Sequence, residues 1–248
     1  MRAHWIKHDR LTSTNTYLAE LLKKKTLKEG TVLIADYQES GRGQGANSWV
    51  SRQGENLLMS FLLYPAFLSA SGQFQLSRLV SLAVCDVLED MGVENHIKWP
   101  NDILSRRGKI AGILIEHSIT AGKISHTIAG IGLNLNQTDF PHFLVPATSM
   151  HLESGHLSDV IQLGELLEDR LLSRYQALKG GNTARLEQEY LEKLFKAGVP
   201  VLFESQDGSF EGIIRGVNEF GELLVERQGK IRAYGHGSIG MKMAFDRS

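Results

Sequence analysis

The order of apolar and polar residues predicts alternating strands and helices along most of the chain. Short apolar runs, several of them β-branched, indicate strands at residues 5–7, 31–35, 56–64, 94–99, 109–116 and 124–136. Apolar positions at helical spacing predict helices at residues 16–25, 72–91, 158–177 and 183–195. Residues 101–102 and 105–108 are interpreted as turns, and residues 140–156, which lack periodicity, as a loop.

The pattern changes near residue 199. From there, short alternating runs are separated by Gly, Asn and Asp, which is typical of a small antiparallel barrel. We therefore place a domain boundary between Ala197 and Gly198, which divides the chain into residues 1–197 and 198–248. The overall prediction is an α+β domain followed by a small C-terminal β-barrel.

Composition narrows the classes of function. The formal net charge of −1 gives no basic field for nucleic acid or a membrane surface. The N-terminus lacks the apolar segment of a signal peptide, and no apolar run reaches membrane-spanning length. Cys85 is the single cysteine and lies among apolar residues at helical spacing, which favours a small buried side chain in a reducing compartment. We expect a cytoplasmic protein that binds neither nucleic acid nor membranes.

A glycine-rich stretch, DYQESGRGQGANSW at residues 36–49, follows a predicted buried strand. Gly41, Gly43 and Gly45 allow close approach of a ligand to the backbone, and Arg42 adds a planar cation suited to phosphate or carboxylate. The same residues are also compatible with a long hairpin turn and a solvated arginine. The stretch alone leaves both interpretations open.

Three later motifs favour the ligand-binding interpretation of this stretch: KWPND at residues 98–102, KIAGILIE at 109–116 and GIGLNLN at 130–136. In this order, and with Ser13-Thr14-Asn15 before them, they resemble the catalytic domain of biotin protein ligases over about residues 4–195. The resemblance implies a mixed sheet of the biotin/lipoate ligase type. It also implies ATP-dependent, Mg²⁺-assisted adenylation of biotin and its transfer to a lysine of a biotin carboxyl carrier protein.

The resemblance also implies roles for individual residues. Lys109 and Arg42 are expected to act on the α-phosphate, and Asp102 to bind Mg²⁺. The residues expected to bind biotin are Ser13, Thr14, Asn15, Gln38, Arg42, Gly43, Gln44, Lys109, Gly112 and Gly132. The residues expected to bind ATP are Trp49, Lys98, Asn101 and Asn134.

Simpler interpretations of five of these positions stay open. Ser13 and Thr14 suit a helix N-cap, Lys109 a solvated turn, and Trp49 a core aromatic. Asp102 is equally suited to pairing with a loop cation.

The sequence departs from the family pattern at Gln44, where many members carry a second arginine. A neutral amide supplies no Coulomb attraction, so we expect weaker retention of biotinyl-adenylate. The motifs begin near Ser13, so we expect no DNA-reading domain before them. Members of the family often dimerise through the catalytic sheet, so a homodimer is a further expectation.

Two other functions remain as alternatives. A lipoate–protein ligase shares the fold, but lipoate lacks the ureido group that the polar Ser13-Thr14-Asn15 and Gln38 cluster suits. A protein that binds biotinyl-adenylate without transferring it has no need of both Lys109 and Arg42.

Overall fold

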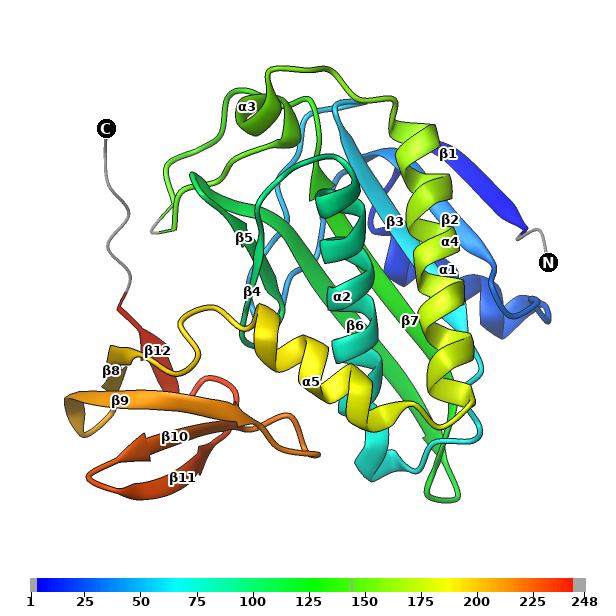
Figure 1. Cartoon of the computed structure of the whole chain (residues 1–248). Coiled ribbons are helices and arrows are strands. Elements are labelled where there is room, and N and C mark those ends of the chain that lie inside the picture. The colour runs from blue at the N-terminus through cyan, green and yellow to red at the C-terminus, as the bar shows by residue number, and fades with distance from the viewer. Residues whose placement is uncertain (1–3, 144, 243–248) are drawn as a thin grey trace.

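The computed structural model describes residues 4–143 and 145–242, which form two sheets and their covering helices (Figure 1). The larger sheet has the order β1-β2-β3-β7-β6-β5-β4 and the smaller β11-β10-β9-β8-β12. In chain order the elements are β1 (Trp5–Leu11), α1 (Thr14–Lys24), β2 (Val32–Gln38), β3 (Asn56–Leu63), the 3₁₀ turn η1 (Ala70–Gln73), α2 (Phe74–Asp90), β4 (His96–Lys98), β5 (Asp102–Ser105), β6 (Gly108–Thr120), β7 (Lys123–Asn134), α3 (Met150–Ser154), α4 (Val160–Lys179), α5 (Thr183–Lys193), β8 (Pro200–Ser205), β9 (Gly208–Val217), β10 (Leu223–Arg227), β11 (Lys230–Tyr234) and β12 (Ile239–Met241).

The large sheet is mixed. Strands β1 and β2 are parallel, and every other pair of adjacent strands in the sheet is antiparallel. Helices α2 and α4 cover one face of it and α1 lies on the other (Figure 1). Alternate residues of β2 divide between the two cores: Val32 and Ile34 pack with α2 and α4, and Leu33 and Ala35 with α1. All of β3 is buried, because helices cover both faces of the sheet there.

The predicted α+β fold is confirmed, with two corrections. Asp102 and Ser105 were interpreted from the sequence as turn residues, but residues 102–105 form strand β5, which pairs with β4 on one side and β6 on the other. Four residues are too short for a periodic signal, and the pairing partners supply the strand's hydrogen bonds. The predicted loop at residues 140–156 contains α3, which Ser149 caps by accepting from the Leu152 N–H and Gly155 ends in the left-handed conformation.

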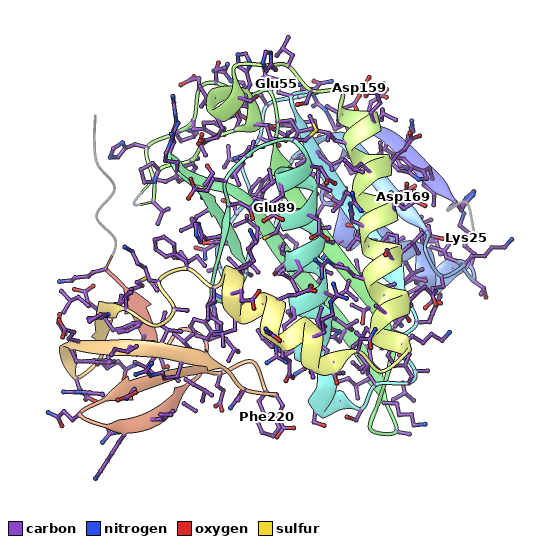
Figure 2. All side chains as sticks on the ribbon, viewed as in Figure 1. Lys25, Glu55, Glu89, Asp159, Asp169 and Phe220 are labelled. Carbon is purple, nitrogen blue, oxygen red and sulfur yellow. The ribbon has the colours of Figure 1, made fainter. Side chains whose placement is uncertain are left out.

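The ends of the other elements fall within three residues of the predictions, except that β1 extends to Leu11 and β6 to Thr120. Helix α4 begins after Asp159, whose carboxylate accepts from the N–H groups of Ile161 and Gln162 (Figure 2). This N-cap fixes the start of the helix two residues beyond the predicted one.

The C-terminal region forms an antiparallel sheet, as its alternation predicts, but not a demonstrated barrel. Strands β11 and β12 are the two ends of the sheet, and no pairing joins them within the described residues. Strand β12 has only three residues, which limits the hydrogen bonds available for closure. The division of the chain at residues 197 and 198 stays a prediction.

This small sheet contacts the larger body through the turn between β9 and β10. Figure 2 shows Phe220 in this turn, and its side chain is exposed. Two residues before it, the carbonyl of Asn218 faces Arg78 of α2, and one residue after it the carbonyl of Gly221 accepts from the Trp99 indole at 2.9 Å. The turn therefore lies directly against the KWPND segment.

Two expectations from composition can be followed in the structure. Cys85 is buried in α2, and burial raises the pKa of its thiol to about 12, so the side chain packs as a small apolar group. Across the described residues, no helix combines the length and the apolar character needed to cross a membrane.

Candidate active site

A cavity of about 460 Å³ lies on the face of the large sheet that carries α1. This volume is within the usual range for small-molecule sites. Every residue expected from the sequence to bind biotin, ATP or Mg²⁺ lines it, namely Ser13, Thr14, Asn15, Gln38, Arg42, Gly43, Gln44, Trp49, Lys98, Asn101, Asp102, Lys109, Gly112, Gly132 and Asn134. Segments up to 121 residues apart in the chain, from Ser13 to Asn134, meet at one place.

The register of β6 and β7 explains why the cavity lies on this face of the sheet. On β6 and β7, Gly112 pairs with Gly132 and Leu114 pairs with Gly130, so these residues share one face of the sheet. The intervening positions point to the opposite face, where Ile113 and Ile131 join the core beneath α2 and α4. The apolar alternation of KIAGILIE and GIGLNLN therefore builds the core on one side and leaves the other side open.

Trp49 uses the space above two of these glycines. A Cβ at Gly112 would lie 2.8 Å from the Trp49 ring, and a Cβ at Gly132 would lie 2.4 Å from it. The indole therefore occupies the space nearest to both glycines. Trp49 is half-buried and lines the cavity, so it is not an ordinary core aromatic.

Asn15 uses the space above the third glycine. A Cβ at Gly130 would lie 2.4 Å from Asn15 Oδ1. The side chain accepts from Ser60 Oγ at 2.6 Å and donates to the Leu114 carbonyl at 3.1 Å and to Glu116 at 2.9 Å. Both donors of the amide are thus engaged, and one acceptor lone pair stays available for a ligand.

The start of α1 presents the other predicted biotin-binding groups. Ser13 is the N-cap residue, but its side chain makes no capping hydrogen bond. Thr14 donates to Gln38 Oε1 from its backbone N–H at 2.7 Å and from its hydroxyl at 3.0 Å. Because Gln38 Oε1 is occupied, its amide nitrogen is the group that faces a ligand as a donor.

The glycine-rich stretch folds into a small hairpin. The Trp49 N–H donates to the Gly41 carbonyl at 2.8 Å, and the Gly43 N–H donates to the Asn47 carbonyl at 2.8 Å. Arg42 lies between these pairs, and its guanidinium contacts the Glu116 carboxylate of β6 at 2.8 Å. The hairpin interpretation is thus confirmed, but the arginine is paired rather than only solvated.

Lys109 lies in a chain of charges at the opposite end of the cavity. Its ammonium is 2.6 Å from Asp102 Oδ1 and 5.6 Å from the centre of the Trp49 ring. The second oxygen of Asp102 is 3.2 Å from the ammonium of Lys98. The side chain of Lys109 is 30% exposed, so the interpretation of a fully solvated turn residue does not hold.

Asp102 was expected to bind Mg²⁺. Each of its oxygens faces an ammonium group, which fits an ion pair better than a metal ligand. Within the described parts of the chain, no cluster of three or more His, Cys, Asp or Glu side chains could hold a metal. The donor set does not fit an ion bound by the protein alone.

Three buried polar atoms at the cavity have no hydrogen-bond partner among the described residues: Gln44 Oε1, Trp49 Nε1 and Asn134 Oδ1. Unpaired buried polar groups are costly, so such atoms indicate a polar ligand. Asn134 is fixed by donating to the Thr148 carbonyl at 2.9 Å, which leaves its oxygen as an acceptor. Asn101 instead donates to the Ile113 carbonyl at 2.8 Å and holds the KWPND segment against β6.

Comparison with known families agrees with this geometry. A family model described as the biotin/lipoate A/B protein ligase family matches residues 8–134, just over half of the chain. The chain belongs to this family.

Individual members of the family match most of the chain. The bifunctional ligase/repressor BirA of Bacillus subtilis is 33% identical over 233 residues, covering 91% of this chain and 70% of that protein. A biotin–[acetyl-CoA-carboxylase] ligase of Paracoccus denitrificans is 30% identical over 224 residues, covering 87% of this chain and 92% of that protein. The structure of a biotin protein ligase from Aquifex aeolicus in complex with biotin and ATP superposes with a TM-score of 0.80 at 26% identity, covering 97% and 99% of the two chains.

Sequence reasoning missed several residues of the site. Phe140 and Phe143 line the cavity from the segment before α3, and His236 lines it from the small sheet. The two phenylalanines themselves, in a segment without periodicity, were the available signal for the first pair. Nothing local marks His236, whose ring lies 6.0 Å from that of Trp99. Glu116 belonged to a recognised motif, but its pairing with Arg42 is visible only in three dimensions.

Proposed function

We propose that this chain adenylates biotin with ATP and transfers the biotinyl group to a lysine of a biotin carboxyl carrier protein. The observation that carries the proposal is a single cavity with hydrogen-bonding groups at one end and the Lys109 ammonium at the other. Family membership and the similarity to biotin protein ligases support it.

The first half-reaction needs no nucleophile from the protein. The carboxylate of biotin attacks the α-phosphorus of ATP, the bond to pyrophosphate breaks, and biotinyl-adenylate forms. Negative charge grows on the α-phosphate during this step, so preorganised cations lower its barrier. Lys109 supplies such a cation from a fixed position, because Asp102 and the Trp49 ring hold it.

The polar cluster at the other end serves recognition. A ureido group buries one carbonyl and two N–H groups, and each needs a partner. The hydroxyls of Ser13 and Thr14, the amide nitrogen of Gln38 and the free lone pair of Asn15 offer donors and acceptors for it. Such a site rejects an acid that lacks the ureido group, which separates biotin from lipoate.

ATP is assigned to the half of the cavity near Trp49 and Asn134. The unpartnered oxygen of Asn134 suits an exocyclic amino group, and the half-buried indole suits stacking. Lys98 lies beside Asp102 at the same end and suits the phosphates. We propose that Mg²⁺ arrives with those phosphates, since the described residues offer no cluster of metal ligands and magnesium usually retains water and phosphate ligands.

In the second half-reaction the carrier lysine attacks the carbonyl carbon of the mixed anhydride, and AMP leaves. This chain's role is to hold the adenylate until the carrier docks. The carrier, a cytoplasmic location and a homodimer are parts of the same proposal. Strand β1 lies at an open end of the large sheet and is the edge at which a second copy would pair.

The test is ATP–pyrophosphate exchange driven by biotin, with lipoate as the control acid. We expect exchange with biotin and none with lipoate. Exchange with lipoate alone would assign the chain to the lipoate branch of the family. Binding of biotin without any exchange would favour a non-catalytic binding protein.

We predict that Gln44→Arg slows the release of free biotinyl-adenylate by about tenfold to 100-fold, because a charge-assisted hydrogen bond is worth roughly 1.5–3 kcal/mol. Gln44 lines the cavity and its Oε1 has no partner among the described residues, so an arginine there reaches the same ligand. The measurement is the amount of free adenylate released with time in the absence of carrier.

The matched control is Gln53→Arg, which adds the same charge on a nearby exposed residue outside the cavity. It is expected to leave release unchanged. Equal release from wild type and Gln44→Arg would contradict the prediction.

A further inference from the structure

Glu116 contacts two residues of the cavity that lie far apart in the sequence, Arg42 of the hairpin and Asn15 of α1. One of its oxygens contacts the Arg42 guanidinium at 2.8 Å, and the other accepts from the Asn15 amide at 2.9 Å. Asn15 is held in turn by Ser60 and by the Leu114 carbonyl. One carboxylate thus fixes both the hairpin arginine and a predicted biotin-binding side chain.

This pairing keeps the two expected catalytic cations apart. Asp102, which holds Lys109, is in register with Gly112 of β6, and Glu116 is four residues further along the same strand. Four residues of strand span roughly 13 Å. Each cation has its own carboxylate, so Arg42 and Lys109 do not share an anion in this arrangement.

We propose that Glu116 is a positioning residue that competes with the substrate's negative charge for Arg42. This inference rests on the proposed function and extends it to a residue outside the cavity lining. When the carboxylate of biotin enters, Arg42 exchanges Glu116 for the substrate anion. Glu116 keeps its hydrogen bond to Asn15, so the ureido end of the site stays in place.

The exposure and chemistry of the pair suit such an exchange. The side chains of Arg42 and Glu116 are 48% and 36% exposed, and ion pairs at such exposure contribute little to stability. The hairpin that carries Arg42 is held by backbone hydrogen bonds, so the guanidinium can move while the loop stays folded. An arginine fork binds the substrate carboxylate as readily as the glutamate carboxylate, since the two groups are chemically alike.

The decisive variant is Glu116→Gln. Glutamine keeps an oxygen that accepts from Asn15 but removes the negative charge that holds Arg42. We expect the Kd for biotin, measured by titration calorimetry, to fall by about two- to fivefold, the range that corresponds to a surface ion pair. The gain should shrink at high ionic strength, because screening weakens the competing pair in the wild type.

Three controls isolate the mechanism. Biotinamide carries no carboxylate, so its Kd should not fall in Glu116→Gln. In an Arg42→Ala background, the substitution should give no gain for biotin, because the shared guanidinium is absent. Glu226→Gln removes the partner of Arg215 in the small sheet, an ion pair of similar exposure, and should leave the Kd unchanged.

The outcomes separate this inference from the proposed function. A purely structural Glu116 gives an equal or higher Kd for biotin in Glu116→Gln, and this result would overturn the inference alone. A gain that persists with biotinamide or without Arg42 would also overturn it. Absence of biotin binding by the wild type would remove the proposed function and the inference together.

Discussion

Lys109→Ala is expected to lower the rate of biotin-dependent ATP–pyrophosphate exchange by about 100-fold or more, which is typical for loss of one preorganised donor to a developing anion. The structure holds this ammonium 2.6 Å from Asp102 and 5.6 Å from the centre of the Trp49 ring. The kcat of exchange should fall more than the affinity for biotin, whose ureido contacts lie at the other end.

The loss has a second component. In Lys109→Ala the carboxylate of Asp102 keeps only Lys98, at 3.2 Å, and its negative charge then repels the phosphates. A double variant that adds Asp102→Asn should therefore recover part of the lost rate, since it removes the uncompensated charge. If the effects of the two substitutions were additive, the double variant would be no faster than Lys109→Ala.

Lys123→Ala is the matched control, because Lys123 lies on the same β6–β7 hairpin but at the turn far from the cavity. Its exchange rate should equal that of the wild type. A loss below about tenfold in Lys109→Ala would show that this ammonium is not the main source of transition-state stabilisation.

The sequence was sufficient to locate the site because its chemistry follows strand periodicity. GIGLNLN places Gly130 and Gly132 at alternate positions of one strand, and Gly132 meets Gly112 of KIAGILIE across the sheet. Ser13 to Asn15 and Gln38 reach the same cavity because α1 follows β1, and β2 pairs with β1 in parallel. Local pattern and family motifs together fixed these neighbours.

The sequence did not reveal how the polar groups pair with one another. The partners of Arg42 and Asn15 lie 74 and 101 residues away at Glu116, and hydrogen bonds over such separations leave no local signal. The same holds for His236, which reaches the cavity from the small sheet. Strand β5 was missed because its hydrogen bonds come from its two neighbours and not from its own composition.

The contact between the small sheet and the body leads to the largest expected effect on stability. Arg78 is only 3% exposed, and it donates to Glu187 at 2.9 Å and to the Val217 carbonyl at 2.7 Å. Its guanidinium also lies 5.0 Å from the centre of the Phe74 ring. Burial lowers the pKa of Arg78 and the charge of Glu187 opposes this shift, so the group depends on its partners.

Arg78→Met is expected to lower the free energy of unfolding by about 2–4 kcal/mol, since it leaves buried carbonyls without a donor. For a chain of this size the melting temperature should fall by about 5–15 °C. Thermal unfolding followed by circular dichroism measures the shift. Arg215→Met removes an exposed ion pair with Glu226 in the small sheet and should change the stability by no more than about 0.5 kcal/mol.

The same substitution should act on the nucleotide half of the site. Arg78 holds the β9–β10 turn, and that turn accepts from the Trp99 indole through Gly221 at 2.9 Å. Trp99 precedes Asp102 by three residues. If the turn loses its contact with Trp99, the Asp102 carboxylate, which orients Lys98 and Lys109, is held less rigidly. Below its melting temperature, Arg78→Met should therefore raise the KM for ATP in the exchange assay and leave the Kd for biotin unchanged, because α1, β2 and β6 hold the biotin contacts.

An equal loss of affinity for both substrates would instead indicate general unfolding of the cavity, and an unchanged melting temperature would show that the turn is held by other contacts.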